Sequence, residues 1–460
     1  MKRPNKIVLV GGGSVSWSPT LINDFLLTPA LQDARYVIFD IDEAAGLMVT
    51  RFGQEVARRM ELECTFEFTA DRTEALTDAD FVVITITTGG LEAMSNDIEI
   101  PEEYRIYQTV GDTVGPGGWA RGLRNVPVFA DLAQEIERLA SDAIVLNYTN
   151  PMATCTKAIS RVSKLRTVGL CHARFELVAF LTRLFGLASE QELTMRAGGI
   201  NHFFWVYDLT VRGEDGFALL RSKLKEARLS DLIVRDLQDE PAHLHNKGRV
   251  ASELFEYYGL LPYIGDRHVS EFFSSYLTGS LDRVQQYGLV RTTIDDRRSS
   301  AARARRQLES FLAGRMKSTD PESGSAIESM LGVRGDEAAA DVIGAIVTGE
   351  GMIDVMNLPN EGQIANLPMG SVVETMGVAD QGGFHPICLG ELPDPILDLT
   401  TRHVKNQDAI VDAALTGDRD QALWALYHDP QCAHLSLPEV KEMAARLLEA
   451  NRSHLPAFFG

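Results

Sequence analysis

The 460-residue sequence has few cysteines and lacks long apolar runs. Its five cysteines are odd in number and show no CxxC spacing, which argues against a disulfide framework or a structural zinc knuckle. No apolar run approaches the roughly 18 residues that cross a bilayer, and the apolar run at residues 7–10 is too short for a signal-peptide core. We therefore expect a cytoplasmic protein in a reducing compartment, with no membrane segment.

Positive charge is also scarce. The 44 Lys and Arg residues face 64 Asp and Glu residues, so the formal net charge is −20. Most of such a surface would repel nucleic acid and anionic membranes, and we expect neither as a partner. What the chain does contain is 45% hydrophobic and 23% charged residues, as in ordinary globular proteins, and enough length for two or three domains.

Short β-branched runs alternate with amphipathic stretches over the first half, which is typical of βαβ units around a parallel sheet. Strands are predicted at residues 6–10, 36–40, 81–87, 143–148, 167–171 and 193–197, and helices at residues 19–27, 43–60, 126–139, 154–162 and 175–185. Further on, residues 297–315 indicate an exposed basic helix and residues 356–367 an irregular segment. We predict a Rossmann-type, doubly wound α/β domain at residues 1–190 and a mainly helical α+β second domain at residues 191–460.

A glycine-rich turn follows the first predicted strand. Gly11 and Gly13 fit the first two glycines of a dinucleotide fingerprint, Ser14 lies beside them, and Ser16 stands where a third glycine is usual. Such glycines permit a tight turn close to a pyrophosphate, and the next helix supplies N–H groups at its start. Asp40 ends the second predicted strand, where a carboxylate would bind the adenosine ribose and disfavour NADP. The pattern therefore predicts NAD binding.

Polar or small residues also end the other predicted strands. They include Thr87, Asn147, Asn150, Cys171 and His172. Because ligands of open α/β sheets bind beyond the carboxyl ends of the strands, we expect these residues to share one edge. Thr87 and Asn147 are the predicted further contacts to the cofactor.

Two further sets of residues could carry chemistry. Cys171 and His202 supply a thiolate and an imidazole, which can bind a divalent ion and leave positions for water or substrate oxygens. Asp266 and Tyr258 could each act as a general base near a metal. Spacing alone does not choose between them.

Taken together, the motifs resemble those of glycoside hydrolase family 4, the NAD- and metal-dependent glycosidases. The matching stretches, in the family's order from residue 7 to about residue 370, are VGGGSVSWSP, TTGGLEA, YQTVGDTVGPGG, NYTNP, GLCHARF, GINHFFW, GDRHVSEFF and NLPNEGQIANLP. The longer run YQTVGDTVGPGGWARGLRNVP, with GLCH and GDRH, is most similar to the α-galacturonidase branch.

The resemblance implies a lactate/malate dehydrogenase-like nucleotide domain, NAD, a Mn²⁺-type metal and a homodimer or homotetramer. Carried over by motif, Cys171 and His202 would bind the metal, and Asp112 and Asn150 would contact a saccharide substrate. His172 stands where phosphoglucosidase members carry an Asp assigned as the acid.

The resemblance also implies a mechanism: oxidation at C3, elimination across C1 and C2, addition of water, and re-reduction of C3. Asp266 matches an acid/base position of some members, and others use a Tyr that aligns near Tyr258. Phospho-sugar members carry an Arg about where Ser95 stands, so an unphosphorylated substrate is favoured.

The predicted substrate is an α-galacturonide or a related α-hexuronide. On a chain of charge −20, a substrate carboxylate needs a local cation, and Arg121, Arg124 and Arg267 lie within or beside the motifs. A guanidinium binds a carboxylate through two charge-assisted bonds. We therefore expect Arg124 and Arg267 to contact the substrate.

Three alternatives remain open. The first is an α-galactosidase or α-glucosidase of the same family. The second is a plain NAD-dependent hydroxy-acid dehydrogenase, which would need a His/Asp pair and an arginine clamp but not Cys171 with His202. The third is a non-catalytic NAD-binding protein, which would have no use for Asn150 or Asp266.

Overall fold

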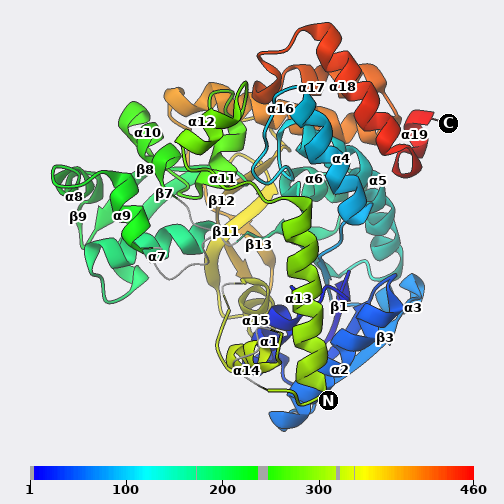
Figure 1. Ribbon diagram of the computed structural model, residues 1–460. Helices are drawn as coiled ribbons and strands as arrows, with labels where there is room; N and C mark the ends of the chain where they lie inside the picture. Colours follow the sequence, from blue (N-terminus) through cyan, green and yellow to red (C-terminus); the bar gives the residue numbers. More distant parts are fainter. Residues whose placement is uncertain (1–4, 172, 237–246, 317–321, 336, 460) are drawn as a thin grey trace.

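The computed structural model describes residues 5–171, 173–236, 247–316, 322–335 and 337–459 (Figure 1). All strands of these residues belong to one mixed sheet, in the order β10-β8-β7-β12-β11-β6-β5-β4-β1-β2-β3, with β9 paired to β8 and β13 paired to β12. The strands are β1 (Lys6–Val10), β2 (Arg35–Phe39), β3 (Thr65–Thr69), β4 (Phe81–Ile84), β5 (Ile144–Asn147), β6 (Arg166–Gly169), β7 (Leu193–Ile200), β8 (Phe203–Val211), β9 (Glu214–Asp215), β10 (Leu261–Pro262), β11 (Met352–Pro359), β12 (Val372–Asp380) and β13 (Gly383–Pro386).

Helices cover both faces of the sheet. Those of the first half are α1 (Ser18–Leu27), α2 (Glu43–Arg59), α3 (Arg72–Leu76), α4 (Gly90–Glu103), α5 (Gly115–Leu139), α6 (Met152–Val162) and α7 (Ala173–Phe185). Those that follow are α8 (Gly216–Lys223), α9 (Leu229–Asp236), α10 (Arg249–Tyr258), α11 (Asp266–Val269), α12 (Leu281–Gln286), α13 (Ile294–Leu312), α14 (Ser325–Met330), α15 (Ala339–Thr348), α16 (Asp394–Thr416), α17 (Arg419–Tyr427), α18 (Leu437–Ala450) and α19 (Pro456–Phe459). None that the described residues form is long and apolar enough to cross a membrane.

The parallel half of the sheet has the strand order β3-β2-β1-β4-β5-β6, which confirms the predicted doubly wound fold. Its central strands are apolar on both faces. Ile7 and Leu9 lie in the core under α1 and α2, while Val8 and Val10 lie in the core under α5 and α16. A parallel strand covered by helices on both sides requires such a continuous apolar run.

The other half of the sheet is antiparallel and continues directly from β6. A single bridge, Asn357 to Gly169, joins β11 to β6, and β12, β7, β8 and β10 follow in antiparallel pairs. The sheet is therefore continuous across residue 190. The prediction of an irregular segment from residue 356 is wrong for residues 356–359, because β11 extends to Pro359 and lies between β6 and β12.

Each predicted strand and helix of the first half forms, with ends that differ by a few residues, except that α5 starts eleven residues earlier, at Gly115. The basic segment expected at residues 297–315 is α13, which in Figure 1 runs alongside α4 at one end and α2 at the other. The sequence reading missed β3, α3 and α4.

Candidate active site

The glycine turn after β1 is held by the end of the neighbouring strand. The N–H groups of Gly11 and Gly12 donate to the carbonyl of Phe39 at 3.0 and 3.1 Å. Gly11 has φ +81°, and a Cβ there would lie 2.7 Å from the carbonyl oxygen of Thr85. The turn therefore requires glycine and leaves its backbone open to a close ligand.

Asp40 is fixed against this turn. Its Oδ2 accepts a hydrogen bond from the Gly13 N–H, and its Oδ1 accepts one from the Asp42 N–H, both at 2.8 Å. A Cβ on Gly13 would lie 2.8 Å from Asp40 Oδ2, so Gly13 permits the contact. Ser14 is half-buried in the same turn, and its carbonyl accepts from the Ser18 N–H at 2.9 Å. The carboxylate is oriented and partly exposed, as hydrogen bonding to a ribose requires.

The ends of β4 and β5 are connected by an arginine of α5. Arg121 Nε donates to the carbonyl of Asn150 at 2.8 Å, and its Nη2 donates to Thr87 Oγ1 at 2.9 Å. Asn147 is fully buried, with its Oδ1 accepting from Thr149 N–H at 2.8 Å and its amide nitrogen directed to Thr156 Oγ1 at 3.2 Å. The Asn147 side chain therefore shapes the turn that carries Asn150.

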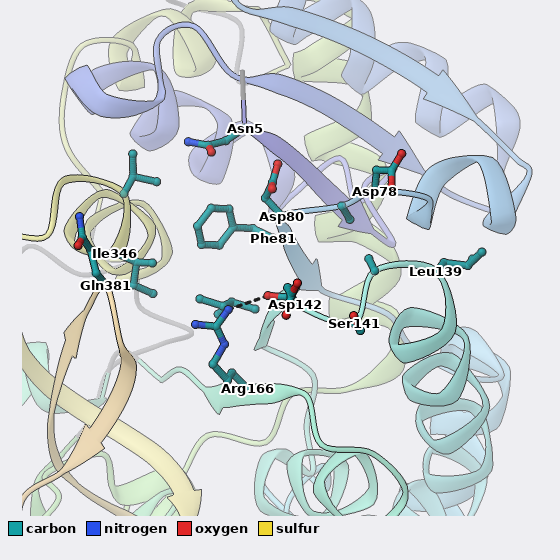
Figure 2. Close-up of a pocket in the computed structure, with 14 residues that line it drawn as sticks. Asn5, Asp78, Asp80, Phe81, Leu139, Ser141, Asp142, Arg166, Ile346 and Gln381 are labelled. Carbon is teal, nitrogen blue, oxygen red and sulfur yellow. Dashed lines mark hydrogen bonds between the residues drawn. The ribbon is translucent and has the colours of Figure 1, made fainter. Parts of the chain in front are cut away.

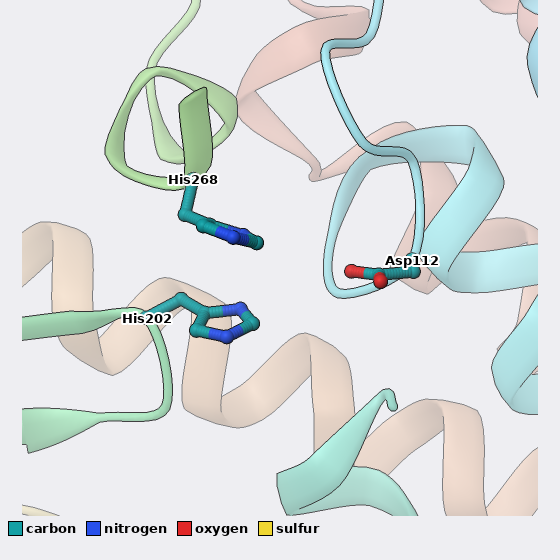
Figure 3. A group of neighbouring side chains, drawn as sticks. All are labelled: Asp112, His202 and His268. Carbon is teal, nitrogen blue, oxygen red and sulfur yellow. The ribbon is translucent and has the colours of Figure 1, made fainter. Parts of the chain in front are cut away.

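Three side chains of types that can bind a metal converge beside this edge. Asp112, His202 and His268 each offer one ligand atom, and these atoms lie within 4.8 Å of one another. Figure 3 shows the Asp112 carboxylate facing the two imidazole rings, whose centroids are 3.9 Å apart. His202 has φ +65°, and its Nδ1 is 2.9 Å from Thr113 Oγ1. One carboxylate and two imidazoles form a donor set that suits a divalent transition metal.

Cys171 is half-buried at the end of β6 and is not one of these three residues. Burial and the nearby Glu374 raise the pKa of its thiol, while a hydrogen bond from the Asn201 side chain acts in the opposite direction. Such a thiol becomes a thiolate ligand only when a cation binds. His172, a predicted catalytic residue, lies outside the described residues.

A buried carboxylate holds the loop that carries Asp112. Glu271 Oε1 accepts from Val110 N–H at 2.7 Å, from Gly111 N–H at 2.9 Å and from Thr109 Oγ1 at 3.0 Å. Burial and the charge of Asp112 raise the pKa of Glu271 to about 7. Sequence reasoning missed both Glu271 and His268, although the motif GDRHVSEFF contains them.

The predicted substrate arginines lie in different surroundings. Arg124 is fully buried, donates from both terminal nitrogens to Asp97, and donates from Nε to the Thr88 carbonyl at 2.8 Å. Its guanidinium is therefore satisfied within the protein. Arg267 is half-buried, with Nε donating to the Val290 carbonyl at 3.0 Å.

Arg297, which the sequence reading left on an exposed helix, reaches the same loop. Its Nη2 donates to the Val110 carbonyl at 3.1 Å, and its Nε is buried with no hydrogen-bond partner. Burial lowers the pKa of both Arg297 and Arg267, and the charge of Asp112 opposes this change in each. Two guanidinium groups therefore lie near Asp112.

The predicted bases are engaged elsewhere. The Asp266 carboxylate is buried and accepts from the N–H groups of Ala251 and Val250 at 2.9 and 3.2 Å, in the first turn of α10. Burial raises its pKa to about 7. Tyr258, the last residue of α10, packs edge-on against Trp205 with ring centroids 5.2 Å apart.

Another tyrosine lies closer to the metal-binding side chains. The buried Tyr263 hydroxyl donates to Glu176 Oε2 at 2.5 Å, and the Tyr263 ring is 6.4 Å from the His268 ring. The sequence reading passed over it because Tyr257 and Tyr258 form the more conspicuous pair.

A separate cavity of about 460 Å³ lies at the opposite edge of the parallel sheet (Figure 2). It is lined where β4, β5 and β6 begin, by residues that include Asp80, Asp142 and Arg166. Arg166 Nη2 donates to the Asp142 carbonyl at 2.7 Å. None of the predicted site residues lines this cavity.

Comparison with known proteins identifies the class. Residues 6–187 match the family described as "Family 4 glycosyl hydrolase", and residues 197–432 match its C-terminal domain. The chain therefore belongs to this family and is a glycosidase, which confirms the resemblance seen in the motifs.

Individual relatives narrow the comparison. An alpha-galacturonidase of Bacillus subtilis (strain 168) is 32% identical over 433 residues, which cover 92% of this chain and 93% of that protein. The crystal structure of lplD from Bacillus subtilis is similar with a TM-score of 0.84 and 30% identity, covering 97% of this chain and all of that one. A 6-phospho-alpha-glucosidase from gut microorganisms, solved with NAD and Mn²⁺, shares the fold with a TM-score of 0.80 and 24% identity, covering 99% of each chain.

Proposed function

We propose that the protein is an NAD- and divalent-metal-dependent glycosidase that cleaves α-hexuronides, with α-galacturonide as the first candidate. The observation that carries this proposal is the convergence of Asp112, His202 and His268 at the edge where Asn150 and Cys171 end their strands. The relative that is an alpha-galacturonidase supports the substrate, and the neighbour solved with NAD and Mn²⁺ supports the cofactors.

The residues present fit both cofactors. The turn of Gly11 and Gly13, beside the oriented Asp40, suits an NAD pyrophosphate and ribose. His202, with Cys171 carried over from the family and with Asp112 and His268 from the geometry, would hold the metal. When bound, NAD⁺ supplies a reversible hydride acceptor, and the cation supplies a Lewis acid for neighbouring sugar oxygens.

The chain's own residues would orient the sugar and move its protons. Asn150 lies on the turn fixed by Asn147 and Arg121, so it would present its amide to the sugar hydroxyls. For the base, Asp266 and Tyr258 stay candidates from the family. The position of Tyr263 makes it a third candidate, because its ring lies near His268 and its hydroxyl donates to Glu176, which could accept its proton; burial and Glu176 raise its pKa, so it would act as a base only beside a bound cation.

The positive groups around Asp112 support a carboxylate substrate. Arg267 and Arg297 are both partly withdrawn from water, and the buried Nε of Arg297 has no partner. A substrate carboxylate would supply the missing acceptor and a charge. We propose that Arg267 and Arg297 bind the substrate carboxylate, whereas Arg124 is paired with Asp97.

The test is a comparison of nitrophenyl glycosides with NAD⁺, Mn²⁺ and a thiol reductant present. We expect hydrolysis of the α-galacturonide to exceed that of the α-galactoside and α-glucoside, to require NAD⁺, and to leave no NADH at 340 nm. Faster cleavage of the neutral sugars would favour the galactosidase or glucosidase alternative. Stoichiometric NADH would indicate a dehydrogenase.

We also propose that the protein forms a homodimer or homotetramer, as the resemblance implies. Light scattering coupled to gel filtration measures the mass directly against the 50.7 kDa chain. A monomer that is fully active would contradict this proposal.

A further inference from the structure

Glu374 is a buried carboxylate at the centre of the sheet that no step of the proposed reaction uses. It is 1% exposed and lies in a row of residues, Gly169, Asn357, Glu374 and Gly199, that crosses β6, β11, β12 and β7. This row joins the parallel and antiparallel halves. It also sets the end of β6, which carries Cys171, level with the end of β7, which carries His202.

Two buried asparagines donate to the same oxygen of this carboxylate. The Asn357 amide nitrogen is 2.8 Å from Glu374 Oε2, and the Asn201 amide nitrogen is 3.2 Å from it. Asn201 directly precedes His202, and both Asn201 and Glu374 influence the pKa of the nearby Cys171 thiol. Glu374 is therefore connected through Asn201 to the turn that carries His202, and its charge also acts on Cys171.

The charge of Glu374 has no cationic partner within 4.0 Å among the described residues. Its Oε1 is buried without a hydrogen bond, and so are the Oδ1 atoms of Asn201 and Asn357. An ionised carboxylate in such surroundings is costly unless a positive charge lies nearby. Asn201 directly precedes His202, which belongs to a group of side chains that could hold a cation.

We propose that Glu374 is the buried counter-charge of the metal site and positions Asn201, and through it Cys171 and His202, for the ion. This role rests on the proposed metal site. Carboxylates behind a ligand shell commonly change metal affinity by about 10- to 100-fold when they are removed. Glu374 is thus a positioning residue that touches neither sugar nor cofactor.

The experiment measures binding of Mn²⁺ alone, by calorimetry and by the electron paramagnetic resonance of free Mn²⁺. We expect Glu374→Gln to weaken Mn²⁺ binding by about 10- to 100-fold while the NAD⁺ dissociation constant stays within about threefold. The matched control is Asp354→Asn, which removes another buried carboxylate, 2% exposed, from the adjacent strand β11. Asp354 Oδ1 lies 3.6 Å from Arg174 Nη1 and forms no hydrogen bond with Asn201. We therefore expect the Mn²⁺ affinity of Asp354→Asn to stay near that of the wild type.

A swapped variant separates charge from packing. In Asn357→Asp with Glu374→Gln, the carboxylate and the amide exchange places across the 2.8 Å hydrogen bond, and the charge stays in the network. We expect this double variant to recover most of the lost affinity. It also provides the test if Glu374→Gln alone fails to fold.

The outcomes are distinct. Unchanged Mn²⁺ affinity in Glu374→Gln, an equal loss in Asp354→Asn, or no recovery in the folded swapped variant would each overturn the role of Glu374. Failure of the wild-type protein to bind Mn²⁺ would instead overturn the proposed metal site itself.

Discussion

The parallel and antiparallel halves of the sheet contribute to the site in different ways. In the parallel half, Gly11, Asp40 and Asn150 each follow their own strand, so the strand order alone brings them to one edge. In the antiparallel half, β7 runs in the opposite direction to β6, and only the register through Asn357 and Glu374 places the end of β7 in the same row as the end of β6. The candidate nucleotide site is therefore formed by a local motif, and the candidate metal site by the pairing of distant segments.

The largest effect expected from this division is the loss of activity without loss of nucleotide binding. His202→Asn removes the imidazole but tolerates the left-handed backbone at φ +65°. We expect kcat to fall at least about a thousandfold, ~4 kcal/mol of transition-state stabilisation, because the metal site is lost. Fluorescence titration should show an NAD⁺ dissociation constant within about threefold of the wild type.

The control for this change is His385→Asn, an exposed imidazole on β13 that pairs with Asp380. It should leave both activity and NAD⁺ binding unchanged. If His202→Asn weakens NAD⁺ binding as much as it weakens catalysis, the two halves are not separable in this way.

The second effect concerns the substrate arginines. Arg297→Gln and Arg267→Gln should each lower kcat/KM for an α-galacturonide. The fall should correspond to about 2–5 kcal/mol of lost transition-state stabilisation, because a buried charge pair with the substrate is lost. Activity on a neutral α-galactoside should change far less. The matched control is Arg298→Gln on the same helix, since Arg298 is exposed and faces Asp295.

If Arg297→Gln lowers kcat/KM equally for the α-galacturonide and the α-galactoside, Arg297 does not bind the substrate carboxylate. Equal losses would show that the arginine holds the loop at Val110, which its Nη2 contacts, and does not select the sugar.

The same division explains what the sequence could predict. The doubly wound fold and the turn of Gly11, Gly13 and Asp40 follow from residues close together in the chain, so the pattern of strands and glycines was enough. The same pattern could not predict the hydrogen-bond partners of Arg124 and Asn147. Each fits a ligand by type, yet the first is satisfied by Asp97 and the second by its own turn.

In the second half, residue type identified the motif GDRHVSEFF but not the directions in which its side chains point. His268 and Glu271 lie in the segment that suggested Asp266, and nothing local shows that the Asp266 side chain turns to α10 while Glu271 holds the Asp112 loop. The direction of Glu271 depends on packing between segments about 160 residues apart, whereas Asp266 contacts N–H groups 15 and 16 residues earlier in the chain.

A third, smaller effect tests the parallel half alone. Asp40→Ser should weaken NAD⁺ binding by about 1.5–3 kcal/mol, because hydrogen bonds from the ribose to a charged group are lost, and should reduce the preference for NAD⁺ over NADP⁺. Mn²⁺ affinity should not change. The control Asp33→Ser removes an acidic residue of the loop before β2. Equal losses in both variants would mean that overall charge, and not the fixed Asp40 carboxylate, attracts the cofactor.

The last prediction concerns Asp266 and the pH dependence of stability. Its pKa is about 7 in the folded protein, and the unfolded value is about 3.9, so between these values the folded state binds the extra proton. Stability from this group is therefore complete below about pH 4 and is lost as the pH rises towards 7, by up to ~1.4 kcal/mol per pH unit. Asp266→Asn should flatten that slope in urea unfolding between pH 4 and 7, without abolishing it, because Glu271 has a similarly raised pKa. An unchanged slope together with a hundredfold fall in kcat would show that Asp266 serves catalysis and not the start of α10.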